Sequence, residues 1–314
     1  MENVKIDLRL EALKRFALAI TILHIAGHFF LGFEASWAQP LTALCTSYSL
    51  EIFFEILNSR LNKKPLAFAG GIKKFIWFLL PGHISAMAVS MLLFTNERIT
   101  PTILATAIAI LSKIIFKVKI NGASKHFFNP SNIGIASVLI LFPWVGIAPP
   151  YQFTENFSGL PDWILPVIFI SIGSFLNTKF TKKMPLIFAW FIGFLFQAVI
   201  RNIFFGDYLL AALNPMSGVA FLLFSFYMIS DPATTPFKFR NQLIFGFSVA
   251  LVYGILVKLH IVFGLFFSLT IVCFIRGVYF TIKNYSDKPI TEKKETEQFA
   301  NVANVGVEYY APQN

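Results

Sequence analysis

The sequence predicts an all-α, polytopic integral membrane protein with about ten transmembrane helices. Of its 314 residues, 56% are hydrophobic and only 13% are charged, and the mean hydropathy is +0.67. A water-soluble domain carries about 25% charged residues, so soluble enzymes and disordered chains are excluded. Cys45 and Cys273 lie far apart in apolar stretches, without the spacing of a zinc site or an iron–sulfur cluster. The lipid bilayer is therefore the expected environment.

The expected helices are stretches of mostly apolar residues bounded by charge, Pro or Gly. A bilayer core about 30 Å thick needs about 20 such residues for each helix. The second and sixth stretches are short and carry polar residues. In chain order the expected spans are residues 15–33, 41–57, 75–94, 101–116, 130–147, 163–176, 184–204, 209–229, 243–258 and 262–282.

Basic residues test this count because Lys and Arg stay on the cytoplasmic side of a membrane. All but three of the 26 Lys and Arg residues fall on one side of the ten spans; the exceptions are Arg98, Arg201 and Lys258. The net charge of +10 is thus a signal of topology and not of a nucleic-acid partner. The pattern predicts an inner (plasma) membrane protein with both termini in the cytoplasm.

The ten spans divide into two halves of five, near residues 1–148 and 160–283, followed by a polar cytoplasmic tail at 284–314. Five helices in each half give the halves opposite orientations, as an inverted repeat requires. Lys113 and Arg276 lie near span ends and are expected to snorkel to the cytoplasmic surface. Asp207 lies near Arg201 and is expected to form a loop ion pair.

Two loops on the predicted cytoplasmic side combine Asn, Asp, Thr and Pro next to membrane helices. In the first, His126-Phe-Phe-Asn-Pro-Ser-Asn132, Asn129 suits a helix N-cap and Pro130 the first helical position. In the second, Met228-Ile-Ser-Asp-Pro-Ala-Thr-Thr-Pro236, two prolines break the helix. Asn214-Pro215 adds a break inside the span 209–229. Polar, interrupted segments in both halves indicate a site where the halves meet.

These two motifs resemble the RnfD/NqrB family, the membrane subunit shared by the Rnf complex and the sodium-pumping NADH:quinone oxidoreductase. The sequence is most similar to a branch found beside enediyne biosynthesis genes. The resemblance covers the ten-helix body and implies a flavin-carrying part of an oxidoreductase, with electron transfer coupled to cation movement. It also implies other subunits and a quinone as partners. The implied flavin-site residues are Asn129, Asn132, Asp231, Thr234 and Thr235.

The sequence departs from this family in the loop that carries covalent FMN. Family members attach FMN through a Thr in a Ser-Gly-Ala-Thr type motif, whereas the loop at 146–162 has Ser158-Gly159 without Ala-Thr. We therefore expect FMN or riboflavin to be bound without a covalent bond. Tyr151, Phe153, Phe157 and Trp163 offer stacking faces, although aromatic residues at a membrane surface also serve as interfacial anchors.

Ionisable residues inside the first three spans form a second candidate site. An acidic side chain at a helix centre costs roughly 3 kcal/mol of insertion free energy, so these groups are expected to face one another or a cavity. Structural hydrogen bonding, haem ligation, a metal site, and a proton or quinone site remain open. The residues are His24, His28, Glu51, Glu55 and His83.

Three functions remain open from sequence. The first is the membrane redox subunit. The second is an ion or small-solute transporter or channel on the same inverted-repeat fold. The third is a scaffold subunit without flavin. Nucleotide hydrolysis and hydrolase chemistry have no supporting motif.

Overall fold

The computed structural model describes residues 8–120, 122–149, 153, 156 and 159–308, and this part of the chain is mostly helical. Its strands form two short antiparallel pairs, with Leu93 opposite Ile147 and Lys117 opposite His126. In chain order the elements are α1 (Leu8–Ala26), η1 (Gly27–Leu31), α2 (Ala38–Asn62), α3 (Ile72–Leu92), β1 (Leu93–Phe94), α4 (Thr100–Ile115), β2 (Lys117–Ile120), β3 (Ala123–His126), α5 (Pro130–Leu141), β4 (Gly146–Ile147), α6 (Leu160–Leu176), η3 (Asn177–Thr181), α7 (Met184–Phe205), α8 (Leu209–Leu213), η4 (Asn214–Ser217), α9 (Val219–Leu223), η5 (Phe224–Met228), α10 (Phe239–Lys258) and α11 (Gly264–Glu308).

Six helical segments of the described chain are long and apolar enough to cross a bilayer, so the protein is a membrane protein. A bent pair, α8–η4 with α9–η5, raises this number to seven if it counts as one span. Of the other expected spans, α4 and α5 are short apolar helices, and α2 is 25 residues long but carries Glu51, Glu55 and Arg60. The six segments are Leu10–Leu31, Ile72–Leu92, Trp163–Thr181, Met184–Phe205, Phe239–Lys258 and Gly264–Ser286.

The α-helix α8 ends at Leu213, at the break expected from Asn214-Pro215, whereas the 68° bend of the segment lies four residues further on, at Gly218. Pro215 cannot donate a backbone hydrogen bond to the preceding turn, and Gly218 adopts an extended conformation between η4 and α9. A straight helix over residues 209–229 therefore does not form. The bend brings α9 back into the bundle, where Phe221 is buried against Phe194.

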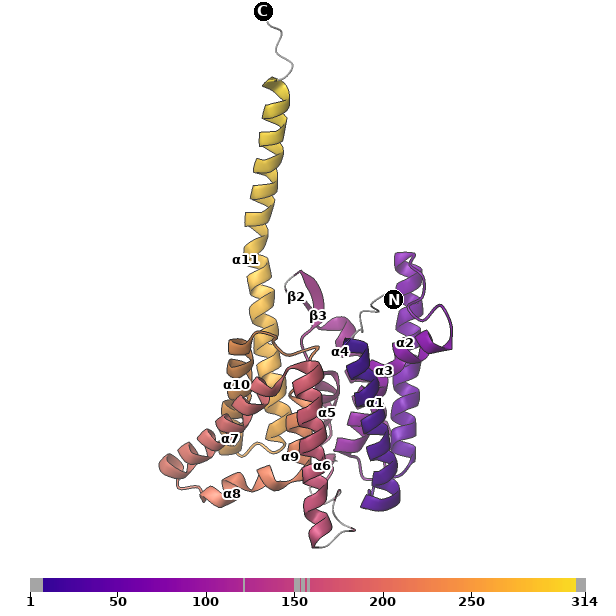
Figure 1. The fold of residues 1–314 in the computed structure, drawn as a ribbon, viewed down its shortest axis with the longest axis vertical. Helices are drawn as coiled ribbons and strands as arrows, with labels where there is room; N and C mark the ends of the chain where they lie inside the picture. Colours follow the sequence, from indigo (N-terminus) through magenta and orange to yellow (C-terminus); the bar gives the residue numbers. More distant parts are fainter. Residues whose placement is uncertain (1–7, 121, 150–152, 154–155, 157–158, 309–314) are drawn as a thin grey trace, which may run out of the picture.

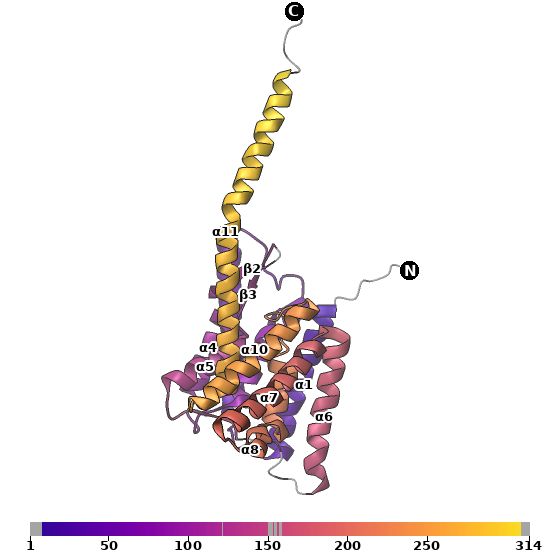
Figure 2. The same ribbon diagram turned by 90° about the vertical axis from the view of Figure 1, so that its left-hand side faces the viewer.

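The helices form two groups joined at the centre (Figure 1), and α11 projects away from them in both views (Figures 1 and 2). α1 and α2 each pack against α3 on one side, α7 packs along α10, and α5 contacts α11 between them. α11 extends far beyond the other helices (Figure 1), continuing through Glu308. The tail boundary expected near residue 284 thus falls inside a continuous helix.

Three helices end in a π-helical turn: η1, η3 and η5. η1 and η3 share one closing geometry. Each is followed by a residue in the left-handed region, Gly32 (φ 84°) and Lys182 (φ 54°), and the next backbone N–H bonds back to the first π-residue at 3.0 Å. A π-turn is rare and marks functional or strained positions, so this recurrence is a specific structural feature.

Glycine permits the close contact of α7 with α10. A Cβ on Gly246 would lie 2.3 Å from the Leu186 carbonyl oxygen, and one on Gly193 would lie 2.7 Å from the Ala250 Cβ. Small residues allow two membrane helices to approach closely where lipid supplies no hydrophobic force between them. The aromatic core around Trp190, which is fully buried, depends on this approach.

We expect Gly246→Val to lower the free energy of unfolding by about 1–3 kcal/mol, because the added methyl groups overpack the contact with α7. Thermal or denaturant unfolding of the purified protein in detergent measures this. Gly146→Ala is the matched control, since no heavy atom lies within 4 Å of a Cβ at Gly146. Equal stability of Gly246→Val and the wild type would contradict the close approach.

Candidate functional site

The two sequence motifs meet at the N-terminus of α5. Asn129 is the N-cap of α5, as predicted: its side-chain oxygen accepts the Asn132 backbone N–H at 3.0 Å. Its Nδ2 donates to the Met228 carbonyl oxygen, also at 3.0 Å. Met228 ends η5, where carbonyl groups lack intrahelical donors. One buried asparagine therefore caps one motif and binds the other.

Asp231 organises the turn that follows η5. Its carboxylate accepts the Ala233 backbone N–H at 3.1 Å and the Thr234 hydroxyl at 2.9 Å. The Thr235 hydroxyl donates to the Asp231 carbonyl oxygen at 2.5 Å. These bonds lie within one turn, so Asp231, Thr234 and Thr235 fix the shape of the loop between η5 and α10.

Asn132 lies one turn further into α5 and faces α11. Its Nδ2 donates to the Phe266 carbonyl oxygen at 3.0 Å and to the Thr270 hydroxyl at 2.8 Å. Its side-chain oxygen is buried without a hydrogen-bond partner among the described residues. The structure thus brings Asn129, Asp231, Thr234 and Thr235 together and places Asn132 against a different helix.

Two cations complete this cluster, and neither was a predicted site residue. Lys183 is fully buried, and its ammonium donates to the carbonyl oxygens of Pro236 (2.8 Å) and Thr235 (3.4 Å). Arg276 donates to the Thr234 carbonyl oxygen, in the loop on the predicted cytoplasmic side. Sequence analysis could not identify them, because nothing in a run such as Lys182-Lys183 shows which lysine is buried.

Burial changes the protonation of Lys183, which lies just outside α7. Its pKa falls to about 8, chiefly because burial disfavours the charged ammonium. The negative charge of Asp231 opposes this shift, and the positive charges of Arg276 and Lys125 add to it. The side chain lies against the ring of Phe237, at 4.2 Å from Nζ to the ring centroid.

The loop expected to face a flavin is described only in part. Phe153 is fully buried and packs against Phe33 and Phe169, so its ring belongs to the core. Trp163 is 73% exposed, as suits an interfacial anchor. Tyr151, Phe157 and Ser158 lie outside the described residues.

The three membrane histidines lie in two separate groups, His24 with His28 and His83 by itself. His24 Nε2 lies 3.1 Å from the Ser90 hydroxyl oxygen, while His28 Nδ1 donates to the His24 carbonyl oxygen at 2.9 Å. His83 lies between two hydroxyl groups, with Thr21 Oγ1 and the Tyr48 hydroxyl each 2.7 Å from a ring nitrogen. His83 therefore links α1, α2 and α3.

The two predicted glutamates also have different partners. Glu51 forms an ion pair with Lys113 at 3.1 Å, which draws that lysine into the bundle and not to the surface as expected. Glu55 accepts the Ala67 backbone N–H at 2.7 Å. Among the described residues, no three His, Cys, Asp or Glu side chains are grouped to hold a metal ion. Haem or metal ligation by His24, His28, Glu51, Glu55 and His83 thus stays a prediction.

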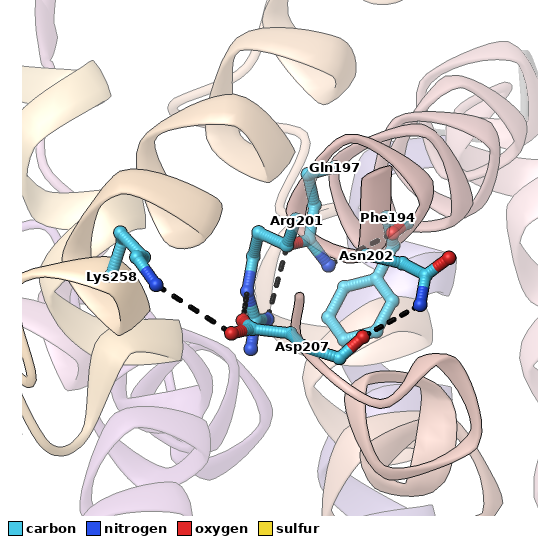
Figure 3. A network of polar contacts seen from close by, with 6 residues as sticks. All are labelled: Phe194, Gln197, Arg201, Asn202, Asp207 and Lys258. Carbon is cyan, nitrogen blue, oxygen red and sulfur yellow. Dashed lines mark hydrogen bonds and ion pairs between the residues drawn. The ribbon is translucent and has the colours of Figure 1, made fainter. Parts of the chain in front are cut away.

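A polar network closes the opposite end of α7 and α10 (Figure 3). The predicted ion pair is confirmed: Arg201 Nε lies 2.7 Å from Asp207 Oδ2, and Lys258 Nζ lies 3.6 Å from Oδ1. The hydrogen bond and charge of Arg201 hold the pKa of the Asp207 carboxyl below its usual range. Gln197 and Asn202 bond within this end of the bundle, to the carbonyl oxygens of Phe194 and Asp207. The network ties the ends of α7 and α10 together and surrounds no predicted site residue.

A scan against protein-family models finds no match to this chain, and a comparison with curated protein sequences finds no significant match.

We expect replacement of Lys183 by Met to change the pH dependence of stability. The folded-state pKa is about 8 and the ordinary value is 10.5, so the unfolded chain binds more protons between these pH values. The contribution of Lys183 to the free energy of unfolding should therefore rise by roughly 3 kcal/mol as pH increases through that window. The Lys183→Met protein should lose this rise. Unfolding of both proteins from pH 7 to pH 10.5 measures the difference.

Lys182→Met is the control, because the neighbouring Lys182 side chain is exposed. It should keep the wild-type profile. A Lys183→Met protein with the wild-type profile would contradict a buried ammonium.

Proposed function

We propose that this chain is an integral membrane redox subunit, similar to the flavin-bearing subunits of the Rnf and sodium-pumping NADH:quinone oxidoreductase complexes. In this proposal it passes electrons between a flavin and a partner protein or quinone, coupled to cation movement. The observation that carries the proposal is the contact of Asn129 with Met228, through which the two motifs of the resemblance form one buried cluster.

We also propose ten spans arranged as two inverted five-helix halves. The matching ends of η1 and η3 support a repeat, since each closes the first helix of its half. A second similarity lies at the start of the second helix of each half, α2 and α7. Gln39, near the start of α2, donates to Thr95 and the Arg98 carbonyl oxygen before α4, and Lys183, at the start of α7, donates to the loop before α10. The basic residues favour an inner-membrane location with both termini in the cytoplasm.

The cofactor of this proposal is FMN or riboflavin, bound without a covalent bond. Asn129, Asp231, Thr234 and Thr235 use their hydrogen bonds inside the cluster, so they suit positioning of a site better than direct contact with a ligand. Two side chains that suit direct contact with a flavin lie at the edge of this cluster. Lys125 offers an ammonium for a phosphate, and Phe237, 64% exposed, offers an aromatic ring. The flavin would supply the electron-carrying chemistry.

A second function is favoured by a separate observation. The Glu51–Lys113 pair lies between α2 and α4, where charges are costly unless they serve a polar route. An ion or small-solute transporter or channel without a redox cofactor would use such a route. A flavin-free scaffold would need neither this pair nor a flavin.

Purified protein is expected to show flavin absorbance. Denaturation should release the flavin into the supernatant, because no covalent bond holds it. Lys125→Ala and Phe237→Ala should each lower the flavin content several-fold relative to wild type. Lys119→Ala, in the same β2–β3 hairpin, is the control and should retain the flavin. Protein without any flavin chromophore would contradict the redox proposal and leave the transporter or the scaffold.

Asp231→Asn should impair electron transfer about tenfold or more, since the amide cannot accept both the Ala233 N–H and the Thr234 hydroxyl as the carboxylate does. Flavin reduction by dithionite and its reoxidation by a soluble quinone provide the assay. Asp207→Asn, in the turn at the other end of the bundle, should leave this activity unchanged. Normal folding with unchanged activity in Asp231→Asn would reduce the loop to a helix cap.

A further inference from the structure

Two of the three basic residues that depart from the charge pattern of the sequence meet at one place. Arg201 and Lys258 lie on the predicted outer side of the membrane, and both side chains point to Asp207 (Figure 3). Arg98, the third exception, has its guanidinium over the Trp144 ring, 4.6 Å from the centroid. Lys and Arg are rare in short outer loops. Their meeting in one network therefore indicates a role for positive charge on this side of the protein.

The network borders a cavity of about 300 Å³ at the ends of α7 and α10. α7 ends at Phe205 and α10 at Lys258, and both helices are long and apolar enough to span the bilayer. The cavity therefore lies where the apolar core of the bilayer meets the head groups of the lipids. Its lining includes Arg201, Asp207, Ala211, Val257, Lys258 and His260.

This polar cavity carries more positive than negative charge. Arg201 and Lys258 are cations, whereas Asp207 is the one carboxylate among the described residues that line it. Arg201 Nε holds Asp207 at 2.7 Å, but Lys258 Nζ lies 3.6 Å away and its side chain is 37% exposed. A charge-assisted hydrogen bond is shorter, at about 2.7–2.9 Å. The Lys258 ammonium is therefore available to a second anion.

A second cavity, of about 390 Å³, adjoins the first, since Val257 and His260 line both. Its other lining residues are mostly apolar and include Ile261, Val262 and Phe263. The side chain of Val262 is 71% exposed, so this apolar cavity lies at the lipid-facing surface. A ligand that occupies both cavities has one anionic group joined to an apolar part.

The turn between α10 and α11 has an unusual backbone beside these cavities. His260 (φ 56°) and Phe263 (φ 61°) both adopt the left-handed conformation, which costs free energy in residues that carry a Cβ. Such conformations persist where the surrounding structure requires them, and they are concentrated at binding sites. Both residues line the apolar cavity. The strained turn is thus part of the cavity wall.

We propose that the two cavities bind an anionic phospholipid such as phosphatidylglycerol. Its phosphate would lie beside Lys258 and Arg201, and the start of an acyl chain would fill the apolar cavity. The phosphodiester carries one negative charge, which matches the one positive charge that Asp207 leaves uncompensated. Basic pockets between membrane helices are known to bind lipid head groups.

The charge and the second cavity decide against other phosphates. The ammonium of a zwitterionic phospholipid would meet a cavity that is already positive, so such a lipid should bind more weakly. A free phosphate ion would occupy the polar cavity and leave the apolar cavity unfilled. The site lies at the opposite end of α7 and α10 from the cluster around Lys183, and lipid binding there requires no flavin.

The experiment measures thermal unfolding of the purified full chain in detergent micelles. Phosphatidylglycerol, phosphatidylcholine or sodium phosphate is titrated at constant ionic strength. A ligand that binds only the folded state raises the unfolding temperature with concentration, from which its affinity follows. We expect a saturable rise with phosphatidylglycerol and an affinity for phosphatidylcholine at least about tenfold lower. Equal effects of the two lipids, or a rise with sodium phosphate that phosphatidylglycerol does not exceed, would overturn the proposal.

Lys258→Met keeps the apolar stem of the side chain and removes its charge, so the affinity for phosphatidylglycerol should fall about tenfold. Arg98→Met is the matched control, because it removes another outer positive charge from a residue that lines neither cavity. It should keep the wild-type affinity. Unchanged affinity in Lys258→Met, or an equal loss in Arg98→Met, would overturn the proposal.

Ala211→Trp tests the site by volume if Lys258→Met does not fold. Ala211 is exposed and lines the polar cavity, so the indole should fill the cavity and abolish the response to phosphatidylglycerol. Leu210→Trp, at the neighbouring exposed position of α8 outside the cavity lining, is the control and should respond as the wild type does. A wild-type response in Ala211→Trp would overturn the proposal.

Discussion

The absence of water inside a bilayer is the constraint on which the rest of this structure depends. Every backbone carbonyl that a helix end or a bend leaves without a donor must find one from another part of the protein. At the end of η5, Asn177 donates to the Phe226 carbonyl oxygen and Asn129 to that of Met228. Two asparagines from different helices thereby allow a helix to stop inside the bundle, and the turn that follows it becomes a fixed element.

Helices far apart in the chain hold that turn in place. Lys183 at the start of α7 and Arg276 on α11 bond its carbonyl groups, while Asp231 shapes it from within. The contact between α2 and α4 differs, because the buried hydroxyl groups of Ser47 and Thr106 have no hydrogen-bond partner among the described residues.

Sequence analysis predicted those features that one segment decides by itself. The membrane class, the N-cap at Asn129, the end of an α-helix at Asn214-Pro215 and the short-range pair Arg201–Asp207 are confirmed. It missed Lys183 and the partners of Arg276 and Lys113, because a hydropathy pattern reports where a helix lies and not which neighbour it meets. For the same reason, the histidines and glutamates that it grouped by depth are distributed over separate contacts.

The sequence by itself therefore determined the solvent of this protein, since a chain with 13% charged residues must place most of its surface in lipid. It also determined local helix ends, because caps and prolines act within a few residues. Only the tertiary structure decided which polar groups are paired. Pairing depends on distances between helices far apart in the chain, and those distances follow from close contacts such as that of Gly82 with Glu51 and Ser47.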